Sequence, residues 1–152
     1  MTAACAAFVK TPGLSPVKTR LAAALGEEVA AEFYDLSWRA VEQVLSEMEF
    51  TPYWAVAESG GLLSWPSFPC IWQGEGGLAE RLNHVYGALL AKHEIVYLVG
   101  ADCPQISAAD FAAARAALAD GTDFAIGPAH DGGFYLLAGA RPIPRARWLG
   151  VQ

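Results

Sequence analysis

The chain has 152 residues, 54% of them hydrophobic, and a formal net charge of −6 at neutral pH. This length and apolar content fit one domain with a single core and argue against general disorder. The acidic balance argues against binding along a nucleic-acid backbone, because such binding needs a positive surface.

The first predicted element is a buried strand at residues 3–9, a short apolar run that ends at Lys10-Thr11-Pro12-Gly13. Helix formers follow at residues 17–25 and stop at Gly26. A longer helix is predicted next, and we expect its apolar stripe to cover one face of a sheet. The stripe comprises Val29, Phe33, Leu36, Ala40 and Val44.

Two short strands are predicted at residues 52–57 and 69–72. Trp54, Trp65 and Trp72 lie in or near them, and we expect these side chains to pack in the core or at its rim. Leucine and valine then recur at helical spacing between residues 78 and 89, and this pattern predicts a helix that leads into a buried strand at residues 95–99.

Ser107 and Asp110 have the spacing of a weak capping box, which predicts a helix start. Strands are predicted at residues 124–127 and 134–138, with a turn at residues 130–133 between them. The alternation of strands and helices predicts a three-layer α/β/α domain over residues 1–152, with a mostly parallel sheet and helices on both faces. No segment has the length of a membrane span or the features of a signal peptide, so we expect a cytoplasmic protein.

Ligands of open α/β sheets bind beyond the carboxyl ends of the strands, which directs attention to the loops there. The first loop and the helix start after it carry Lys10, Gly13, Lys18, Thr19 and Arg20. Backbone N–H groups at a helix start and nearby cations suit a phosphate group. The spacing alone fits solvated surface cations equally well.

Two later loops carry carboxylates. Asp102 follows the strand at 95–99, where it could hold a divalent cation on a diphosphate. Asp131 precedes Gly132 and Gly133, which allow close backbone approach, and it could ligate a metal or orient an acceptor. Aspartate and glycine are also ordinary turn residues, and each motif alone fits that interpretation better.

Four motifs in order carry a resemblance to a known family. They are FVKTPGLSPVKTRLAAALG at residues 8–26, QGEGGLAERL at 73–82, LVGADCPQIS at 98–107 and IGPAHDGGFYLL at 126–137. The chain resembles the bacterial GT-A-type glycosyltransferases of the arsenosugar-biosynthesis kind, within the nucleotide-diphospho-sugar transferase superfamily.

This resemblance implies a donor nucleotide against the first loop, where Lys10, Lys18 and Arg20 match the basic positions of the motif. Gln73, Gly77 and Arg81 match the second motif, which would line the base or ribose. Asp102 corresponds to the metal-binding carboxylate for Mg2+ or Mn2+. Asp131 and its glycines would lie on the opposite rim, with Asp131 helping to orient the acceptor.

The chain departs from the family in two ways. Many GT-A enzymes carry Asp-x-Asp after this strand, whereas this chain has Asp102-Cys103-Pro104. The family also continues past the position of Trp148 into further secondary structure with another acidic motif, whereas this chain stops at Gln152, so we expect that the C-terminal segment and part of the acceptor site are missing. Loss of terminal elements should expose an apolar face and a strand edge, from which we expect self-association into a homo-oligomer.

The leading functional hypothesis is therefore transfer of a sugar from a nucleoside-diphosphate sugar to an unidentified small-molecule acceptor. The main alternative is nucleotidyl transfer from a nucleoside triphosphate to a phosphorylated small molecule, because the first loop also resembles guanylyltransferases that act on phospholactate. A third hypothesis is a non-catalytic protein for nucleotide binding or assembly.

Overall fold

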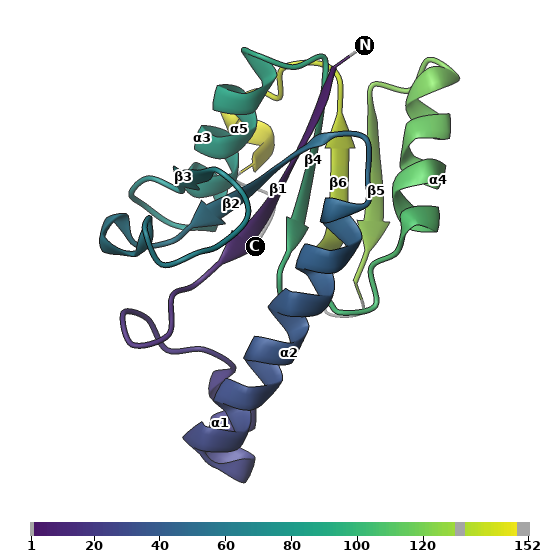
Figure 1. Ribbon diagram of the computed structural model, residues 1–152. Coiled ribbons are helices and arrows are strands. Elements are labelled where there is room, and N and C mark those ends of the chain that lie inside the picture. Colours follow the sequence, from purple (N-terminus) through teal and green to yellow (C-terminus); the bar gives the residue numbers. More distant parts are fainter. Residues whose placement is uncertain (1, 130–132, 149–152) are drawn as a thin grey trace.

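The computed structural model describes residues 2–129 and 133–148, and its strands form one six-stranded sheet in the order β3-β2-β1-β4-β6-β5 (Figure 1). The strands are β1 (Ala3–Val9), β2 (Thr51–Val56), β3 (Cys70–Trp72), β4 (Ile95–Gly100), β5 (Phe124–Pro128) and β6 (Phe134–Gly139). The helices are α1 (Thr19–Leu25), α2 (Glu27–Ser46), α3 (Leu78–Leu90), α4 (Ala108–Ala119) and α5 (Arg145–Trp148), with a 3-10 turn, η1, at Ser59–Gly61. The predicted strands are confirmed within one residue at each end, whereas α5 was not predicted.

The sheet is mostly parallel, as the sequence predicts. β1 pairs in parallel with β2 and β4, and β2 pairs in parallel with β3. β6 lies antiparallel between β4 and β5. The central strands β1 and β4 are almost continuously apolar because both of their faces are covered, a pattern typical of parallel strands.

Helices cover both faces of the sheet, which confirms the three-layer arrangement (Figure 1). On one face, α2 and α4 contribute Val41, Leu45 and Phe111 to the larger hydrophobic cluster. On the other, α3 and α5 contribute Val85 and Trp148 to the second cluster. None of the helices in the described part of the chain is both long and apolar enough to cross a bilayer.

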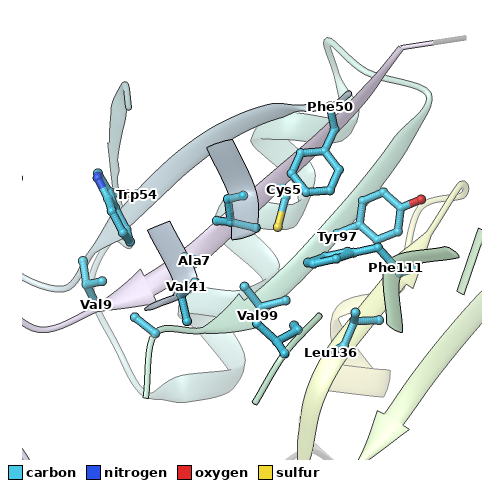
Figure 2. Packing of buried hydrophobic residues seen from close by; sticks show 14 of the residues in the cluster. Cys5, Ala7, Val9, Val41, Phe50, Trp54, Tyr97, Val99, Phe111 and Leu136 are labelled. Atoms are coloured by element: carbon cyan, nitrogen blue, oxygen red, sulfur yellow. The ribbon is translucent and has the colours of Figure 1, made fainter. Parts of the chain in front are cut away.

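Figure 2 shows how the larger cluster is packed around the middle of β1 and β4. The ring of Phe50 lies 5.5 Å from that of Tyr97 and 5.1 Å from that of Phe111, between ring centroids. Cys5 lies beside these rings and is fully buried. Burial raises the pKa of the Cys5 thiol well above its ordinary value, so the thiol stays protonated as part of the core.

Aromatic side chains fix the connection between β2 and β3 against α2. Trp54 is fully buried and Trp65 is 8% exposed, and their ring centroids lie 5.3 Å apart. The ring of Trp38 from α2 contacts both, at 5.9 Å and 5.1 Å. The prediction that Trp54 and Trp65 pack in the core is therefore confirmed.

Helix α2 turns a different face to the core from the predicted stripe. Phe33 and Leu36 are 52% and 68% exposed, so the prediction is wrong for them. The buried residues are Ala30, Tyr34, Ser37, Val41 and Leu45. The buried stripe is thus displaced by one position, and its serine made it look less apolar than the neighbouring stripe. The start of α2 also extends with α1 beyond the strand ends, where no sheet surface lies beneath it (Figure 1).

Candidate functional site

A cavity of about 940 Å3 lies at the carboxyl ends of β1, β2 and β4. These strands are parallel, so the loops that follow them meet at one edge of the sheet. One wall is the loop after β1, which we call the basic loop (residues 10–18), and others are the starts of α1 and α3. The predicted site residues that line it are Lys10, Lys18, Thr19, Arg20, Gln73, Gly77, Arg81 and Asp102. The structure therefore brings together residues from three of the four motifs.

Positive charge predominates in this cavity. Its cationic residues are Lys10, Lys18, Arg20 and Arg81, and its only acidic lining residue within the described ranges is Asp102. Within residues 2–129 and 133–148, the ion pairs lie in α2 and beside β5, and none involves these five side chains. The cavity thus presents four cations and one carboxylate that form no ion pair among the described residues, in a chain whose formal net charge is −6.

Side chains of the second motif, residues 73–82, hydrogen-bond to the loop before α3 and to the strand ends beside it. Arg81 donates from Nε to the Gly76 carbonyl at 3.0 Å, and from Nη1 to the Ala57 carbonyl at 3.0 Å and to Gln73 Oε1 at 3.3 Å. The amide nitrogen of Gln73 donates to the carbonyls of Val9 and Ala55. The amide of Gln73 therefore ties the ends of β1 and β2 together, in addition to lining the cavity.

The basic loop has an unusual backbone at its end. Lys18 has φ 50° and ψ 49°, the left-handed conformation that side chains other than glycine seldom adopt, and it lies immediately before α1. Such strain costs of order 1–2 kcal/mol and concentrates at functional sites. Gly13, at φ 89°, does not line the 940 Å3 cavity but an adjoining one of about 680 Å3, and the two share Ser15 and Val17.

Asp102 lies at the mouth of the cavity, exposed, at the end of β4. A Cβ on Gly100 would lie 2.8 Å from Asp102 Oδ1, so the absence of a side chain at Gly100 leaves room for the carboxylate over the strand end. Asp102 also lines a cavity of about 450 Å3, which shares Phe8, Leu78 and Gly100 with the larger one. The two cavities thus adjoin along the strand ends.

The structure describes residues 126–129 and 133–137 of the fourth motif. Gly133 lines the 450 Å3 cavity, and its carbonyl accepts a hydrogen bond from the Ala129 N–H at 2.9 Å. The predicted residues Asp131 and Gly132 lie outside the described residues. Within the described ranges, no group of three or more histidine, cysteine, aspartate or glutamate side chains is placed to hold a metal ion. Among the described residues, Asp102 is the acidic side chain that lines the 940 Å3 cavity.

Tyr34 and Glu58 support the site and were not predicted from the sequence. The hydroxyl of Tyr34, which lines the cavity, accepts the Lys10 N–H at 2.8 Å. The carboxylate of Glu58 accepts the Thr11 N–H, with both oxygens within 3.1 Å of the nitrogen. These partners lie 24 and 47 positions apart in the chain, and neither residue belongs to a motif that would have indicated the contact.

Tyr34 should make the stability of the protein fall at alkaline pH. Burial raises its pKa from 10.0 to about 12. The neutral phenol therefore contributes stability that is complete below pH 10 and is lost as the pH rises toward 12, where the unfolded chain releases its proton first. Urea unfolding at increasing pH should show a smaller alkaline loss for Tyr34→Phe than for the unmodified protein. Tyr86, whose pKa is raised similarly, contributes to both proteins, so its effect cancels in the comparison. Equal losses in the two proteins would therefore contradict this prediction.

A cavity of about 990 Å3 lies at the opposite edge of the sheet, beside the amino end of β4 and the carboxyl ends of α3 and α4. Its walls are mostly apolar, and Arg115 is the only arginine or lysine that lines it within the described ranges. None of the site residues predicted from the sequence lines it. The two cavities are similar in size, and the convergent polar groups are at the carboxyl ends of the strands.

The fold matches solved structures over the whole chain. The "putative nucleotide-diphospho-sugar transferase" of Desulfovibrio desulfuricans G20 superposes with a TM-score of 0.86 and 26% identity, covering 100% of this chain and 70% of that one. The 4-diphosphocytidyl-2C-methyl-D-erythritol synthase of Anaerococcus prevotii DSM 20548 superposes with a TM-score of 0.58 and 12% identity, covering 98% of this chain and 75% of that one. The second likeness concerns the fold alone.

The sequence comparisons give a family but no curated relative. No curated protein matches the chain. A family profile matches residues 48–152, which include three of the four motifs and the ends of β2 and β4. Since this match covers well over half of the chain, the protein belongs to the family of uncharacterized proteins conserved in bacteria, DUF2064.

Proposed function

We propose that the protein binds a nucleoside-diphosphate sugar in the 940 Å3 cavity and transfers the sugar to a small-molecule acceptor. The observation that carries this proposal is the set of cations, Lys10, Lys18, Arg20 and Arg81, which face one cavity without an ion pair among the described residues. A diphosphate supplies the missing negative charge, and arginine and lysine bind it through charge-assisted hydrogen bonds. The 26% identical transferase-like structure supports the same ligand class.

In the proposed reaction, an acceptor hydroxyl oxygen forms a bond to the anomeric carbon while the bond from that carbon to the diphosphate oxygen breaks. The nucleoside diphosphate leaves, and the hydroxyl proton passes to a base. Lys18 and Arg20 would stabilise the negative charge that develops on the leaving diphosphate, which is the main chemical demand of the step. Asp131, predicted to orient the acceptor, keeps that role as a prediction.

The residues present fit a hard divalent cation that is bound together with the diphosphate. Mg2+ in proteins commonly uses one or two carboxylates, with substrate phosphates and water completing its shell. Asp102 supplies one carboxylate at the cavity mouth. When bound, Mg2+ or Mn2+ would neutralise part of the charge on the leaving group.

Replacement of Asp102 by asparagine should weaken the binding of the cation without weakening the binding of the nucleotide. Without metal, Asp102→Asn should bind a nucleoside diphosphate as tightly as the unmodified protein or tighter, because a negative charge near the phosphates is removed. The increase in affinity that Mg2+ gives should shrink about tenfold or more, since a direct carboxylate ligand is lost. Calorimetric titration with and without Mg2+ measures both effects. Asp120→Asn, at the exposed end of α4, is the matched control, and an unchanged Mg2+ effect in Asp102→Asn would reject the assignment.

Nucleotidyl transfer is the second candidate, and the likeness to a diphosphocytidyl synthase over 98% of the chain favours keeping it. In this reaction a substrate phosphate attacks the α-phosphorus of a nucleoside triphosphate, and pyrophosphate leaves. Incubation with each nucleoside triphosphate and, separately, with sugar nucleotides discriminates the two reactions. Free nucleoside diphosphate formed only with an acceptor supports glycosyl transfer, whereas pyrophosphate formed only with a phosphorylated acceptor supports nucleotidyl transfer.

The remaining expectations are proposals as well. A protein that binds nucleotide but turns over no donor with any acceptor would support the non-catalytic hypothesis. Self-association is tested by analytical ultracentrifugation over a range of concentrations, and a monomer at every concentration would contradict it. The relation to the arsenosugar-type enzymes and the single-domain organisation with a missing segment likewise stay predictions.

A further inference from the structure

We infer that Glu58 is a positioning residue that holds the basic loop in the shape in which its cations face the cavity. The inference rests on the proposed function only for the identity of the ligand. Glu58 follows β2 and does not line the 940 Å3 cavity, so it reaches the site only through the loop.

Thr11 is the point at which the β2–β3 connection holds the basic loop. Its N–H donates to both carboxylate oxygens of Glu58, at 3.0 and 3.1 Å, and its hydroxyl accepts the indole N–H of Trp65 at 3.0 Å. The Thr11 carbonyl accepts the N–H groups of Leu14 and Ser15, which closes the turn of the loop. Thr11 is only 7% exposed, so water does not readily replace these partners.

The carboxylate of Glu58 is charged when it makes these contacts. Burial raises its pKa, but hydrogen bonds from Ser15 and Thr11 lower it by more, and the net shift is downward. Hydrogen bonds to an ionised acceptor are stronger than those between neutral groups, so the charge strengthens the attachment of the loop. An amide at this position would keep the shape of the side chain without that charge.

The close packing of Gly61 against the basic loop is a second observation that supports the positioning role of Glu58. Gly61, in η1, lies so near the loop that a Cβ on it would be 2.3 Å from Thr11 Oγ1 and 3.2 Å from Glu58 Oε1. Its φ lies outside the left-handed region, so an alanine there would be opposed by this contact and not by its own backbone. Gly61→Ala should therefore displace Thr11 and crowd the Glu58 carboxylate, without removing the charge of Glu58.

The positioning role predicts that loop order and anion affinity change together while the fold is retained. In Glu58→Gln, the backbone amides of Thr11, Gly13, Leu14 and Ser15 should exchange hydrogen faster, and affinity for inorganic pyrophosphate should fall about five- to tenfold. Gly61→Ala should reproduce both effects, and Glu58→Asp should restore part of the affinity. Glu47→Gln, at the carboxyl end of α2, is the matched control and should change neither quantity.

Hydrogen exchange by mass spectrometry and calorimetric titration with pyrophosphate and Mg2+ test the inference on the full chain. Loop exchange that is unchanged in both Glu58→Gln and Gly61→Ala would overturn it, whether or not pyrophosphate binds. Faster loop exchange with unchanged pyrophosphate affinity would also overturn it, because the loop shape would then not matter to binding. If the unmodified protein binds no pyrophosphate, the proposed function fails and the exchange result alone decides the role of Glu58.

Discussion

Removal of two cations from the cavity should weaken nucleotide binding by about 100-fold or more. Hydrogen bonds to charged groups contribute roughly 1.5–3 kcal/mol each, and Lys18→Ala with Arg20→Ala removes two such donors from the proposed diphosphate site. Alanine has the same difficulty as lysine with the left-handed backbone at position 18, so the change isolates the ammonium group. The ligand is the nucleoside diphosphate that raises the melting temperature most in a thermal-shift screen, and its affinity is measured by calorimetry.

A second lysine provides the matched control for charge. Lys92 is exposed and follows α3, at the edge of the sheet opposite to the cavity. Lys92→Ala removes one positive charge, as each of the two substitutions in the double variant does, but should leave the affinity within a factor of two. A Lys18→Ala, Arg20→Ala protein that binds as tightly as the unmodified protein would exclude the basic loop from the nucleotide site.

Trp54→Ala should lower the free energy of unfolding by about 3–5 kcal/mol, the usual range for removal of a large buried aromatic side chain. Trp54 is fully buried, and its indole N–H donates to the Pro66 carbonyl at 2.6 Å. The change would leave a cavity and an unpaired carbonyl where the β2–β3 connection packs against α2. Since small domains are stable by only about 5–15 kcal/mol, much of the stability would be lost.

Urea unfolding followed by circular dichroism measures this loss. Leu63→Ala is the control, because Leu63 lies in the same connection but is 101% exposed, and its loss should stay within about 0.5 kcal/mol. A loss below about 1 kcal/mol in Trp54→Ala would mean that the aromatic cluster does not support the connection as the structure indicates.

The meeting of the candidate site residues at one edge of the sheet could be predicted because it follows from topology. Lys18 and Asp102 are 84 positions apart in the sequence, yet both follow neighbouring parallel strands, and parallel strands bring their following loops to one edge. The short apolar runs that predicted β1 and β4 were sufficient for this step. The motifs then indicated which of the loop residues to consider.

The contacts that support the site could not be predicted, because they depend on packing. Tyr34 was overlooked because the neighbouring stripe of α2, with Phe33 and Leu36, is more apolar, and only the course of the helix past the strand ends decides which stripe is covered. Glu58 and Thr11 meet only once η1 is folded against the basic loop. No periodicity or local spacing encodes either contact.

The contact between Trp65 and Thr11 gives the protein an internal optical reporter. Indole emission responds to hydrogen bonding and to nearby aromatic rings, and Trp65 hydrogen-bonds to the basic loop while its ring contacts those of Trp38 and Trp54. A ligand that rearranges the loop would therefore alter the intrinsic fluorescence of the unlabelled protein, so that binding can be followed in real time without a dye or an assay of turnover.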